Sequence, residues 1–473
     1  MKKQFLSLLL ILGFCSGLVA QDTKKEVKYG QYNGLPRQDQ AMQKWRENRL
    51  GQFIHWGLYA IPGGVWKDKT YEGAAEWLQI SAKVPREEWE QLIHDFSIEK
   101  YDPNEWAAIA KEMGVKYVTI TTKHHDGFCL WPSKYTEFDI EATPYKKDLL
   151  GEFVKAYTKA GIDVNFYYSI LDWRHTGWRY DVKSIEDAEA FETLMEYSKN
   201  QLLELIERYP EVKGFWFDGT WDKSWKLNGK FSYELEKAMK DKSPGLVVSS
   251  RMRADEYGKR HIDSNGRLMG DYYSVYERRL PLPWDEEITK MDWECCMTVP
   301  ENQWGYHQDW SLSHIKSPLE LTEMIVHAVS QNGNFLLNFG PMGNGDIRKE
   351  ERFIAKEIGK WMDENSEAIY GCGPSGLQKQ DWGYFTKNNK SGKVYMNVFN
   401  NPVIGKYRVK LKKGQTLKKA SLIGKQSEAL HLEQISKTVY FVVPANVNTK
   451  DPFVIVLEIE EKESRKFHQK ALT

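Results

Sequence analysis

The chain has 473 residues, and its 66 lysine and arginine residues are balanced by 66 aspartate and glutamate residues. This balance argues against a nucleic-acid-binding protein, which needs a basic face to neutralise phosphates, and against a basic protein of the membrane surface. The length is sufficient for two or three domains. Aromatic residues make up 13% of the chain and include 18 tryptophans. They either fill a large core or line a site for a flat, weakly apolar ligand, and composition alone does not choose between the two.

Residues 1–20 have the pattern of a secretory signal peptide. Two lysines precede an apolar stretch, and small residues ending in Ala20 precede a polar segment. The apolar stretch is too short for a membrane span, which takes about 20 residues, and a buried helix is the alternative. We therefore expect export to the periplasm or the outside medium. A lipoprotein anchor at Cys15 is less favoured, because Phe14 stands where lipoprotein processing needs a small residue.

Between residues 21 and 370, short apolar runs alternate with helical patterns. Asp102-Pro103 and Ser317-Pro318 mark two helix starts, because each is a capping residue followed by proline at the first helical position. This alternation predicts a (β/α)8-type barrel with inserted loops. An open doubly wound sheet is the alternative, but no glycine-rich phosphate loop follows the first strand. The predicted strands are residues 52–56, 117–123, 164–169, 214–218, 246–251, 269–274, 292–298 and 334–338.

After residue 370 the helical patterns stop. Alternating strand patterns at residues 394–399, 406–411, 438–443 and 453–460 are separated by Asn, Gly and Lys turns. They predict a small β-sandwich with a short tail. The expected division is therefore a signal peptide (1–20), a barrel (21–370) and a C-terminal β-sandwich domain (371–473).

Carboxylates and histidines gather at the carboxyl ends of the predicted barrel strands, where catalytic groups of such barrels lie. Tryptophans are close to them in sequence, whereas phosphate loops, nucleophile elbows and His-Glu-x-x-His motifs are missing from the sequence. Carboxylates in an aromatic pocket are what glycosidic-bond cleavage requires, since one donates a proton and another handles the cationic sugar. The polar strand-end residues include His55, His124, His125, Asp126, Tyr168, Asp172, Asp218, Arg251, Asp271, Glu277, Glu294 and Asn338.

Two of these segments stand out, GFWFDG around Asp218 and TTKHHDGF around His124 and His125. Asp218 ends an apolar strand, although a helix cap or turn residue would look the same. The paired histidines are candidate metal ligands, but neighbouring strand residues point to opposite faces, so we predict no metal site. We also predict no cofactor. The imidazoles fit better as hydrogen-bond donors and acceptors for sugar hydroxyls. The alternative is that both histidines are buried in the core.

A set of sequence segments resembles, in order and spacing, the α-L-fucosidases of glycoside hydrolase family 29. These segments are FIHWG, AEWL, KYVTITTKHHDGFCLW, FWFDGTW, SSR, GNFLLNFGP and NSEAIYGC. The resemblance runs from about residue 30 to about residue 460. It implies that Asp218 is the nucleophile of a retaining reaction, with the two carboxyl groups about 5–5.5 Å apart. Tyr168 is matched less firmly, because Tyr167 lies beside it. The fucose-binding residues that the resemblance implies are His55, Glu76, Trp77, His124, His125, Tyr168, Trp216 and Arg251. Trp221 is added to this set because it lies close to them in sequence.

The acid/base is not fixed by a motif, and two glutamates compete for the role. Glu277, in GDYYSVYERRLP, resembles the family's arrangement and is favoured, whereas Glu294, in DWECCMT, is the alternative acid/base or a supporting carboxylate. Asp218 must be ionised at neutral pH, as an ordinary aspartate is. Glu277 must keep its proton until the leaving group departs, so we expect burial or the Asp218 charge to raise its pKa.

The sequence therefore predicts an exported, retaining, exo-acting α-L-fucosidase that hydrolyses terminal fucosyl linkages of oligosaccharides or glycoconjugates. One alternative is a barrel glycosidase for another sugar, such as a galactoside. Another is a fucose-binding protein that has lost catalysis. The expected partner is a fucosylated glycan, without nucleic acid and without a membrane span. The sequence leaves open the linkage, the oligomeric state and the role of the C-terminal domain.

Overall fold

The structure, a computed structural model, describes residues 27–30, 36–402, 405–425, 428–445 and 447–461. Its centre is a curled sheet of eight parallel strands in the order β7-β6-β5-β4-β1-β10-β9-β8. The two edge strands approach each other through an isolated parallel bridge between Ser249 and Tyr272, which brings the sheet round toward a closed barrel. The strands are β1 (Leu50–Ile54), β4 (Tyr117–Lys123), β5 (Asp163–Ser169), β6 (Gly214–Asp218), β7 (Val247–Val248), β8 (Tyr273–Glu277), β9 (Trp293–Thr298) and β10 (Gly333–Phe339).

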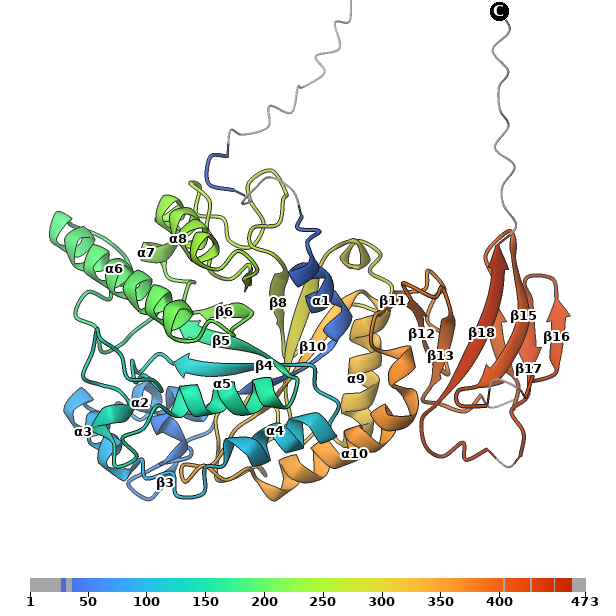
Figure 1. Cartoon of the computed structure of the whole chain (residues 1–473), viewed down its shortest axis with the longest axis horizontal. Coiled ribbons are helices and arrows are strands. Elements are labelled where there is room, and N and C mark those ends of the chain that lie inside the picture. Colours follow the sequence, from blue (N-terminus) through green and yellow to red (C-terminus); the bar gives the residue numbers. More distant parts are fainter. Residues whose placement is uncertain (1–26, 31–35, 403–404, 426–427, 446, 462–473) are drawn as a thin grey trace, which may run out of the picture.

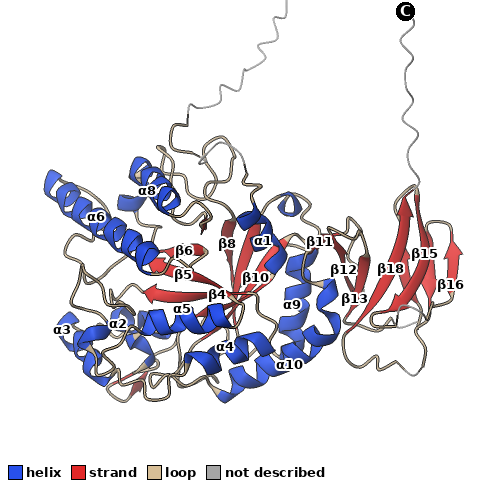
Figure 2. Cartoon of the chain, viewed as in Figure 1, coloured by secondary structure: helices blue, strands red, loops and turns tan. Residues whose placement is uncertain are grey.

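Helices lie around the outside of this sheet (Figures 1 and 2). The predicted starts hold, since Asp102 caps α4 ahead of Pro103, and Ser317 forms a capping box with Glu320 at α9. The connection after β7 contains no helix in the described residues, and the one after β8 contains only the short turn η5 (Ile288–Lys290). The α-helices are α1 (Gln40–Asn48), α2 (Leu78–Ser81), α3 (Arg86–Glu90), α4 (Pro103–Glu112), α5 (Leu149–Lys159), α6 (Ile185–Arg208), α7 (Lys223–Lys226), α8 (Gly229–Lys242), α9 (Pro318–Ser330) and α10 (Lys349–Asn365).

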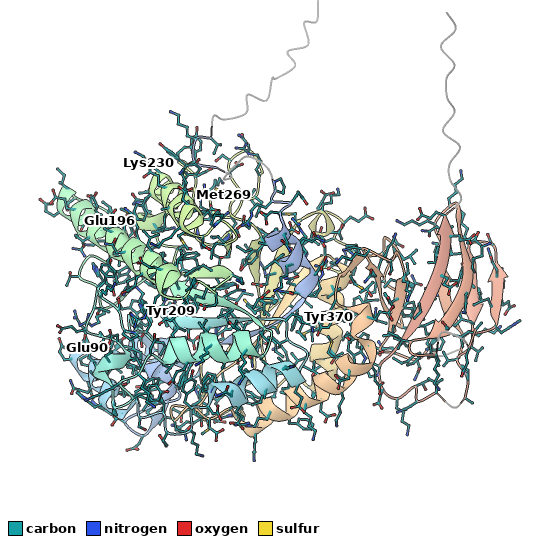
Figure 3. The ribbon with its side chains drawn as sticks, viewed as in Figure 1. Glu90, Glu196, Tyr209, Lys230, Met269 and Tyr370 are labelled. Atoms are coloured by element: carbon teal, nitrogen blue, oxygen red, sulfur yellow. The ribbon has the colours of Figure 1, made fainter. Side chains whose placement is uncertain are left out.

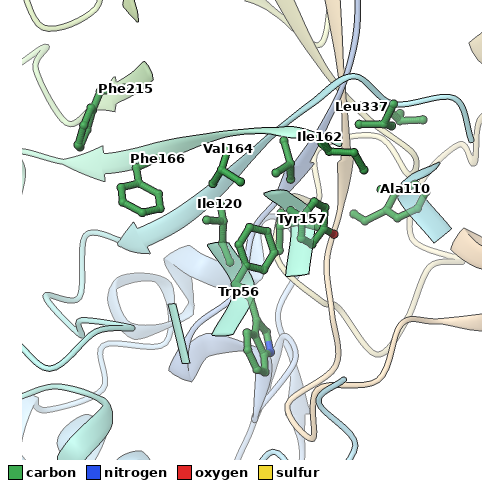
Figure 4. Close-up of a cluster of buried hydrophobic side chains, with 14 of the residues drawn as sticks. Trp56, Ala110, Ile120, Tyr157, Ile162, Val164, Phe166, Phe215 and Leu337 are labelled. Atoms are coloured by element: carbon green, nitrogen blue, oxygen red, sulfur yellow. The ribbon is translucent and has the colours of Figure 1, made fainter. Parts of the chain in front are cut away.

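Successive residues of each strand divide between two cores, because side chains alternate across a strand. Between the sheet and the helices lies a large apolar layer that includes Ile120, Phe166 and Phe215 (Figure 4). Inside the barrel lies a separate, aromatic-rich cluster that includes Tyr167 and Trp216. The barrel is therefore filled by side chains below its active end, as such barrels generally are.

The C-terminal part is a two-sheet β-sandwich beside the barrel (Figure 1). One sheet contains β11 (Cys372–Pro374), β12 (Gly383–Asn388), β13 (Val394–Val398), β15 (Gln415–Leu422) and β18 (Phe453–Glu461). The other contains β14 (Tyr407–Lys410), β16 (Leu432–Ile435) and β17 (Thr438–Phe441). Tyr370, labelled in Figure 3, lies at the junction, and its hydroxyl donates a hydrogen bond to the Gly114 carbonyl oxygen.

The predicted barrel and sandwich are thus confirmed as a fold class. The predicted strands 117–123 and 214–218 coincide with β4 and β6, whereas the strand predicted at 269–274 is shifted toward Glu277. In the C-terminal part, β11, β12, β15 and β16 escaped prediction. The division at residue 370 stays a prediction, and the predicted signal peptide lies outside the described residues. Among the described residues, no helix combines the length and the apolar character that a membrane crossing requires.

Candidate active site

A small pocket opens at the carboxyl ends of the barrel strands, with a volume of about 110 Å³. Nine of its lining residues belong to the set predicted from the sequence, so the fold brings most of that set to one place. Three of them, Asp218, Glu277 and His55, come from the ends of β6, β8 and β1. The residues that line the pocket are Phe53, His55, Glu76, Trp77, His124, His125, Trp216, Asp218, Trp221, Glu277 and Trp304.

Asp218 is the last residue of β6, and its carboxylate accepts hydrogen bonds from two sides. The Tyr167 hydroxyl donates to Oδ2 at 3.0 Å, and the Arg251 guanidinium donates to Oδ1 at 3.2 Å. Burial raises the pKa of Asp218, the Arg251 charge opposes that rise, and the Glu277 charge adds to it. The two donors favour the charged form, which is the form that a nucleophilic carboxylate needs.

Glu277 is the last residue of β8, and it shares Arg251 with Asp218. The second terminal nitrogen of that guanidinium donates to Glu277 Oε2 at 2.7 Å, while Arg251 Nε donates to the Ser274 carbonyl oxygen. Burial acts to raise the pKa of Glu277, but the charge and hydrogen bond of Arg251 outweigh it, so the pKa lies below the ordinary glutamate value. The expected upward shift is therefore wrong, because the nearest charge is a cation.

The three histidines of the pocket are neutral hydrogen-bonding groups. Burial lowers the pKa of His55 and of His125 to about 3, and it lowers the pKa of His124 well below the ordinary histidine value. His55 Nδ1 donates to the Asn338 amide oxygen at 2.6 Å, which leaves Nε2 as an acceptor. The Ser169 hydroxyl donates to a backbone carbonyl and so accepts from His125 Nδ1 at 2.6 Å. His125 Nε2 is therefore an acceptor, 3.8 Å from Asp218 Oδ2.

Glu76, Trp77 and Trp221 form another wall of the pocket, and Trp173 packs against Trp77. Glu76 Oε2 accepts a hydrogen bond from the Gly305 amide at 3.0 Å, and burial raises the pKa of this carboxyl to about 7. Trp77 stacks with Trp221 at a centroid distance of 6.3 Å and meets Trp173 edge to face at 5.2 Å. Trp77 is 37% exposed, so this wall reaches from the pocket to the surface.

The geometry thus combines two carboxylates on one arginine with neutral imidazoles and indole faces. The sequence model of the alpha-L-fucosidase family matches residues 18–367 of the chain. The chain belongs to the alpha-L-fucosidase family. It is accordingly a glycoside hydrolase, as predicted.

Family relatives cover most of the chain. The tissue alpha-L-fucosidase of Rattus norvegicus is 30% identical over 409 residues, which cover 82% of this chain and 82% of that protein. A crystal structure of an alpha-L-fucosidase GH29 from Bacteroides thetaiotaomicron is similar with a TM-score of 0.90 and 54% identity, over 94% of this chain and 99% of that one. A further structure from that organism, a trapped covalent intermediate with 2-fluoro-fucosyl fluoride in a Glu-to-Gln variant, matches equally well, over 92% and 99% of the two chains.

The predicted contact of Tyr168 with substrate is wrong for this family member, because Tyr168 lies on the outer face of β5. Its hydroxyl donates to Gln201 on α6 at 2.8 Å, and its ring lies under the buried Lys123 ammonium. Tyr167 faces the barrel interior, where it pairs in register with Trp216 and reaches Asp218. The alternation of Asn165, Tyr167 and Ser169 along β5 was the available signal.

Glu294, the alternative acid/base, does not line the pocket of this fucosidase. It is the second residue of β9, is 2% exposed, and accepts a hydrogen bond from the Tyr117 hydroxyl at 2.7 Å. Burial raises the pKa of Glu294 to about 7. Its place in the barrel interior favours a supporting role.

Sequence reasoning missed two residues at the site, Phe53 and Trp173. It left open whether Tyr167 or Tyr168 faces the pocket, and it placed Trp304 near the site only by its position in the sequence. Phe53 and Trp304 line the pocket, and Trp173 lies against both Trp77 and His125. Phe53 lies two positions before His55 in the FIHWG segment, so strand alternation places both side chains on the same face. Trp304 and Trp173 lie on loops, where no sequence period indicates direction.

The site of the family member also contains a group of possible metal ligands. Ligand atoms of His124, His125 and Asp218 lie within 4.8 Å of one another. The reason given against a metal was incorrect, because β4 ends at Lys123 and both imidazoles point into the pocket from the turn that follows. A cation there would meet the Arg251 guanidinium, which already binds Asp218. The donor set fits hydroxyl groups of a sugar better.

Proposed function

We propose that the enzyme is a retaining, exo-acting α-L-fucosidase, which removes terminal fucose from oligosaccharides or glycoconjugates through a covalent intermediate on Asp218. The observation that carries this proposal is the Arg251 guanidinium, which binds Asp218 and Glu277 at the same time. Two carboxyl groups bound to one guanidinium lie near each other, and a retaining glycosidase needs closely spaced carboxyl groups. The covalent intermediate trapped in the Bacteroides thetaiotaomicron relative supports the same route.

In the first step, an Asp218 oxygen attacks the anomeric carbon of fucose while the bond to the leaving oxygen breaks. Glu277 gives its proton to that oxygen, so the leaving group departs as an alcohol. In the second step, the Glu277 carboxylate removes a proton from water, and the water oxygen displaces Asp218 from the anomeric carbon. Two inversions at one carbon return the original anomeric configuration.

The protonation of Glu277 is proposed to depend on substrate. Its side chain is 35% exposed, whereas that of Arg251 is 9% exposed. A leaving group placed over Glu277 removes this remaining water and raises the pKa of the carboxyl by desolvation. Once the ester forms at Asp218, the lost negative charge lowers the pKa of Glu277 again, which suits the base step.

Selection of a single terminal fucose is proposed to follow from the size and lining of the pocket. Its volume of about 110 Å³ suits one sugar residue and not an internal chain segment. His55 and His125 offer acceptor nitrogens to the ring hydroxyls. Phe53, Trp216 and Trp304 offer apolar surface, which the C5-methyl group of fucose can cover.

The nucleophile is tested with Asp218→Asn in a folded protein. We expect turnover of an aryl α-L-fucoside to fall by at least about 10⁴-fold, as for loss of a covalent nucleophile. Proton NMR of the wild-type reaction should show α-fucose as the first product. Near-normal turnover by the variant, or release of the β-anomer first, would refute the proposed mechanism.

The acid/base is tested with Glu277→Ala, and Glu294→Gln is a matched control because Glu294 is a second buried glutamate of the same barrel. Glu277→Ala should lose far more activity on natural glycans than on an activated aryl fucoside, and azide should restore part of the loss. Glu294→Gln should show neither effect. The reverse result would assign the role to Glu294.

Sugar specificity and location need separate measurements. A panel of aryl glycosides should show strong preference for α-L-fucoside over galactosides, and equal rates would favour a different glycosidase. We also propose export through residues 1–20, for which the sequence pattern is the support. Cell fractionation and N-terminal sequencing of the mature protein test it, and an intact Met1 in the cytoplasm would refute it.

A further inference from the structure

A groove of about 710 Å³ lies between the barrel and the β-sandwich, away from the active-site pocket. Its barrel side is formed by residues 283–290 and by Ser330 and Gln331, and its sandwich side by residues 374–385 with Lys412. Figure 1 shows β11 and β12 beside α9 at this junction. The volume is within the range of about 300–1,000 Å³ that is typical of small-molecule sites.

The groove lies at the opposite end of the barrel from the catalytic carboxylates. Lys290 and Gln331 precede β9 and β10, so they mark the amino ends of these strands, whereas Asp218 and Glu277 mark carboxyl ends. A strand as long as β10 spans roughly 23 Å. A ligand in the groove therefore does not occupy the active-site pocket.

Trp284 makes this groove chemically unusual. Its side chain is 74% exposed, although the other large aromatic residues of the barrel mostly lie in its cores or around the pocket. It is followed by Asp285 and Glu286, and Leu282 nearby is 59% exposed. An indole held at the edge of a polar groove offers a flat apolar face to a ligand that also forms hydrogen bonds.

The rest of the lining combines apolar residues with polar ones, and its charges balance. Three acidic residues (Asp285, Glu286 and Asp381) are matched in number by three basic ones (Lys290, Lys379 and Lys412). In the described part of the chain, the Gln378 side-chain amide has no hydrogen-bond partner, so it can donate to and accept from a ligand. Balanced charge gives no preference for an anion or a cation, and it favours a neutral, hydroxyl-rich ligand.

We propose that this groove is a second carbohydrate-binding site, in which Trp284 stacks on a pyranose ring of a neutral glycan chain. It would hold a part of the glycan that carries no fucose, or a neighbouring glycan of the same glycoconjugate, and so keep substrate near the enzyme. This role rests on the proposed function, because keeping a glycan near the pocket serves an enzyme that degrades glycans. The site itself is independent of the catalytic carboxylates.

Binding is tested on the full chain with three neutral, fucose-free probes: lacto-N-tetraose, chitotetraose and a xyloglucan heptasaccharide. Saturation-transfer NMR and calorimetry are run with the active-site pocket filled by excess fucose. At least one probe should bind wild-type protein with a Kd below about 10 mM. Trp284→Ala should weaken that Kd by about tenfold or more, whereas Trp284→Phe should retain part of the affinity.

Phe353→Ala is the matched control, because Phe353 is an exposed aromatic residue of α10 outside the groove. It should leave the Kd unchanged. Both Trp284→Ala and Phe353→Ala should keep wild-type kcat/KM on an aryl fucoside, but only Trp284→Ala should slow fucose release from immobilised mucin. If the wild type did not hydrolyse the aryl fucoside, the proposed function would be refuted, whereas the measured binding of the probes would still decide the second site.

Three results would overturn the second site. No probe binds the wild type, or Trp284→Ala binds as well as the wild type. The third is a wild-type dimer in mass photometry that Trp284→Ala converts to a monomer, which would make the groove an interface between copies of this chain.

Discussion

At the scale of single residues, Arg251 controls the charge of both carboxylates. It is buried, its guanidinium lies 4.1 Å from the Trp216 ring centre, and it donates to Asp218, Glu277 and the Ser274 carbonyl. A cation between two carboxylates favours the ionised form of each one. Asp218 needs that form for attack, whereas Glu277 needs it only in the second step.

We therefore predict a shift of the whole pH profile in Arg251→Met. Without the guanidinium the pKa of both carboxyl groups rises, so the acidic limb set by Asp218 and the alkaline limb set by Glu277 both move to higher pH. The expected shift of log kcat/KM against pH is about one unit. Arg279→Met is the control, because in the described part of the chain Arg279 packs over the Tyr276 ring and contacts neither carboxylate. Limbs that stay in place, or move in opposite directions, would contradict the shared role of Arg251.

Tyr167 and Tyr168 offer a matched pair for a second prediction. Tyr167→Phe removes a donor to the charged Asp218, so kcat/KM should fall about 10- to 100-fold, and the acidic limb should move to higher pH. Tyr168→Phe removes the bond to Gln201 in the outer core. It should leave kcat/KM within about threefold and reduce the free energy of unfolding by about 1 kcal/mol. Equal kinetic losses in the two variants would contradict the assigned faces of β5.

At the scale of elements, the turn after β6 needs a glycine next to Asp218. Gly219 has φ of +68°, and a Cβ there would lie 2.3 Å from the Leu171 Cβ and 2.5 Å from its backbone nitrogen. The residue that follows the proposed nucleophile therefore packs directly against the loop after β5. A side chain there would displace the carboxylate as well as strain the turn.

Gly219→Ala should therefore reduce the free energy of unfolding by about 3 kcal/mol and also reduce activity. Gly161→Ala is the control, because Gly161 has a similar φ of +82° but no atom within 4 Å of the added Cβ. It should cost only about 1 kcal/mol, with normal kcat/KM. Urea unfolding measures both, and a similar loss in the two variants would refute the proposed packing constraint.

At the scale of the whole molecule, the barrel and the sandwich share apolar packing. Tyr384, Tyr395, Val454 and Val456 of the sandwich belong to the outer core of the barrel, and the Tyr384 ring stacks on His327 of α9 at 5.0 Å. The sandwich also has a core of its own, which includes Trp382 and Phe385. The five-stranded sheet of the sandwich therefore contributes one face to the outer core of the barrel and the other face to the core of the sandwich.

We accordingly predict one cooperative thermal transition for the full chain, because neither part can open without exposing the shared core. Calorimetric and van't Hoff enthalpies of unfolding should agree. Tyr395→Ala should lower the Tm, and the variant should still unfold in a single transition. Two separate transitions in the wild type would show that the shared packing contributes little to stability.

Local patterns in the sequence were sufficient for the barrel, for the family and for most of the pocket. Strands that end in Asp218 or precede His124 and His125 carry their functional groups at fixed offsets, and a barrel brings all strand ends together. Trp77, Trp216 and Trp221 line the pocket as the sequence predicted, whereas no sequence pattern indicated the exposure of Trp284.

The tertiary structure decided what depends on residues far apart in the chain. Arg251 meets Asp218 and Glu277 from 33 and 26 positions away, so the low pKa of Glu277 could not be predicted from its own segment. The choice of Tyr167 over Tyr168 required the exact phase of β5, because a shift of one residue exchanges the two faces of a strand. The groove exists only because residues 283–290 and 374–385 fold against each other, and proximity of that kind has no local signature.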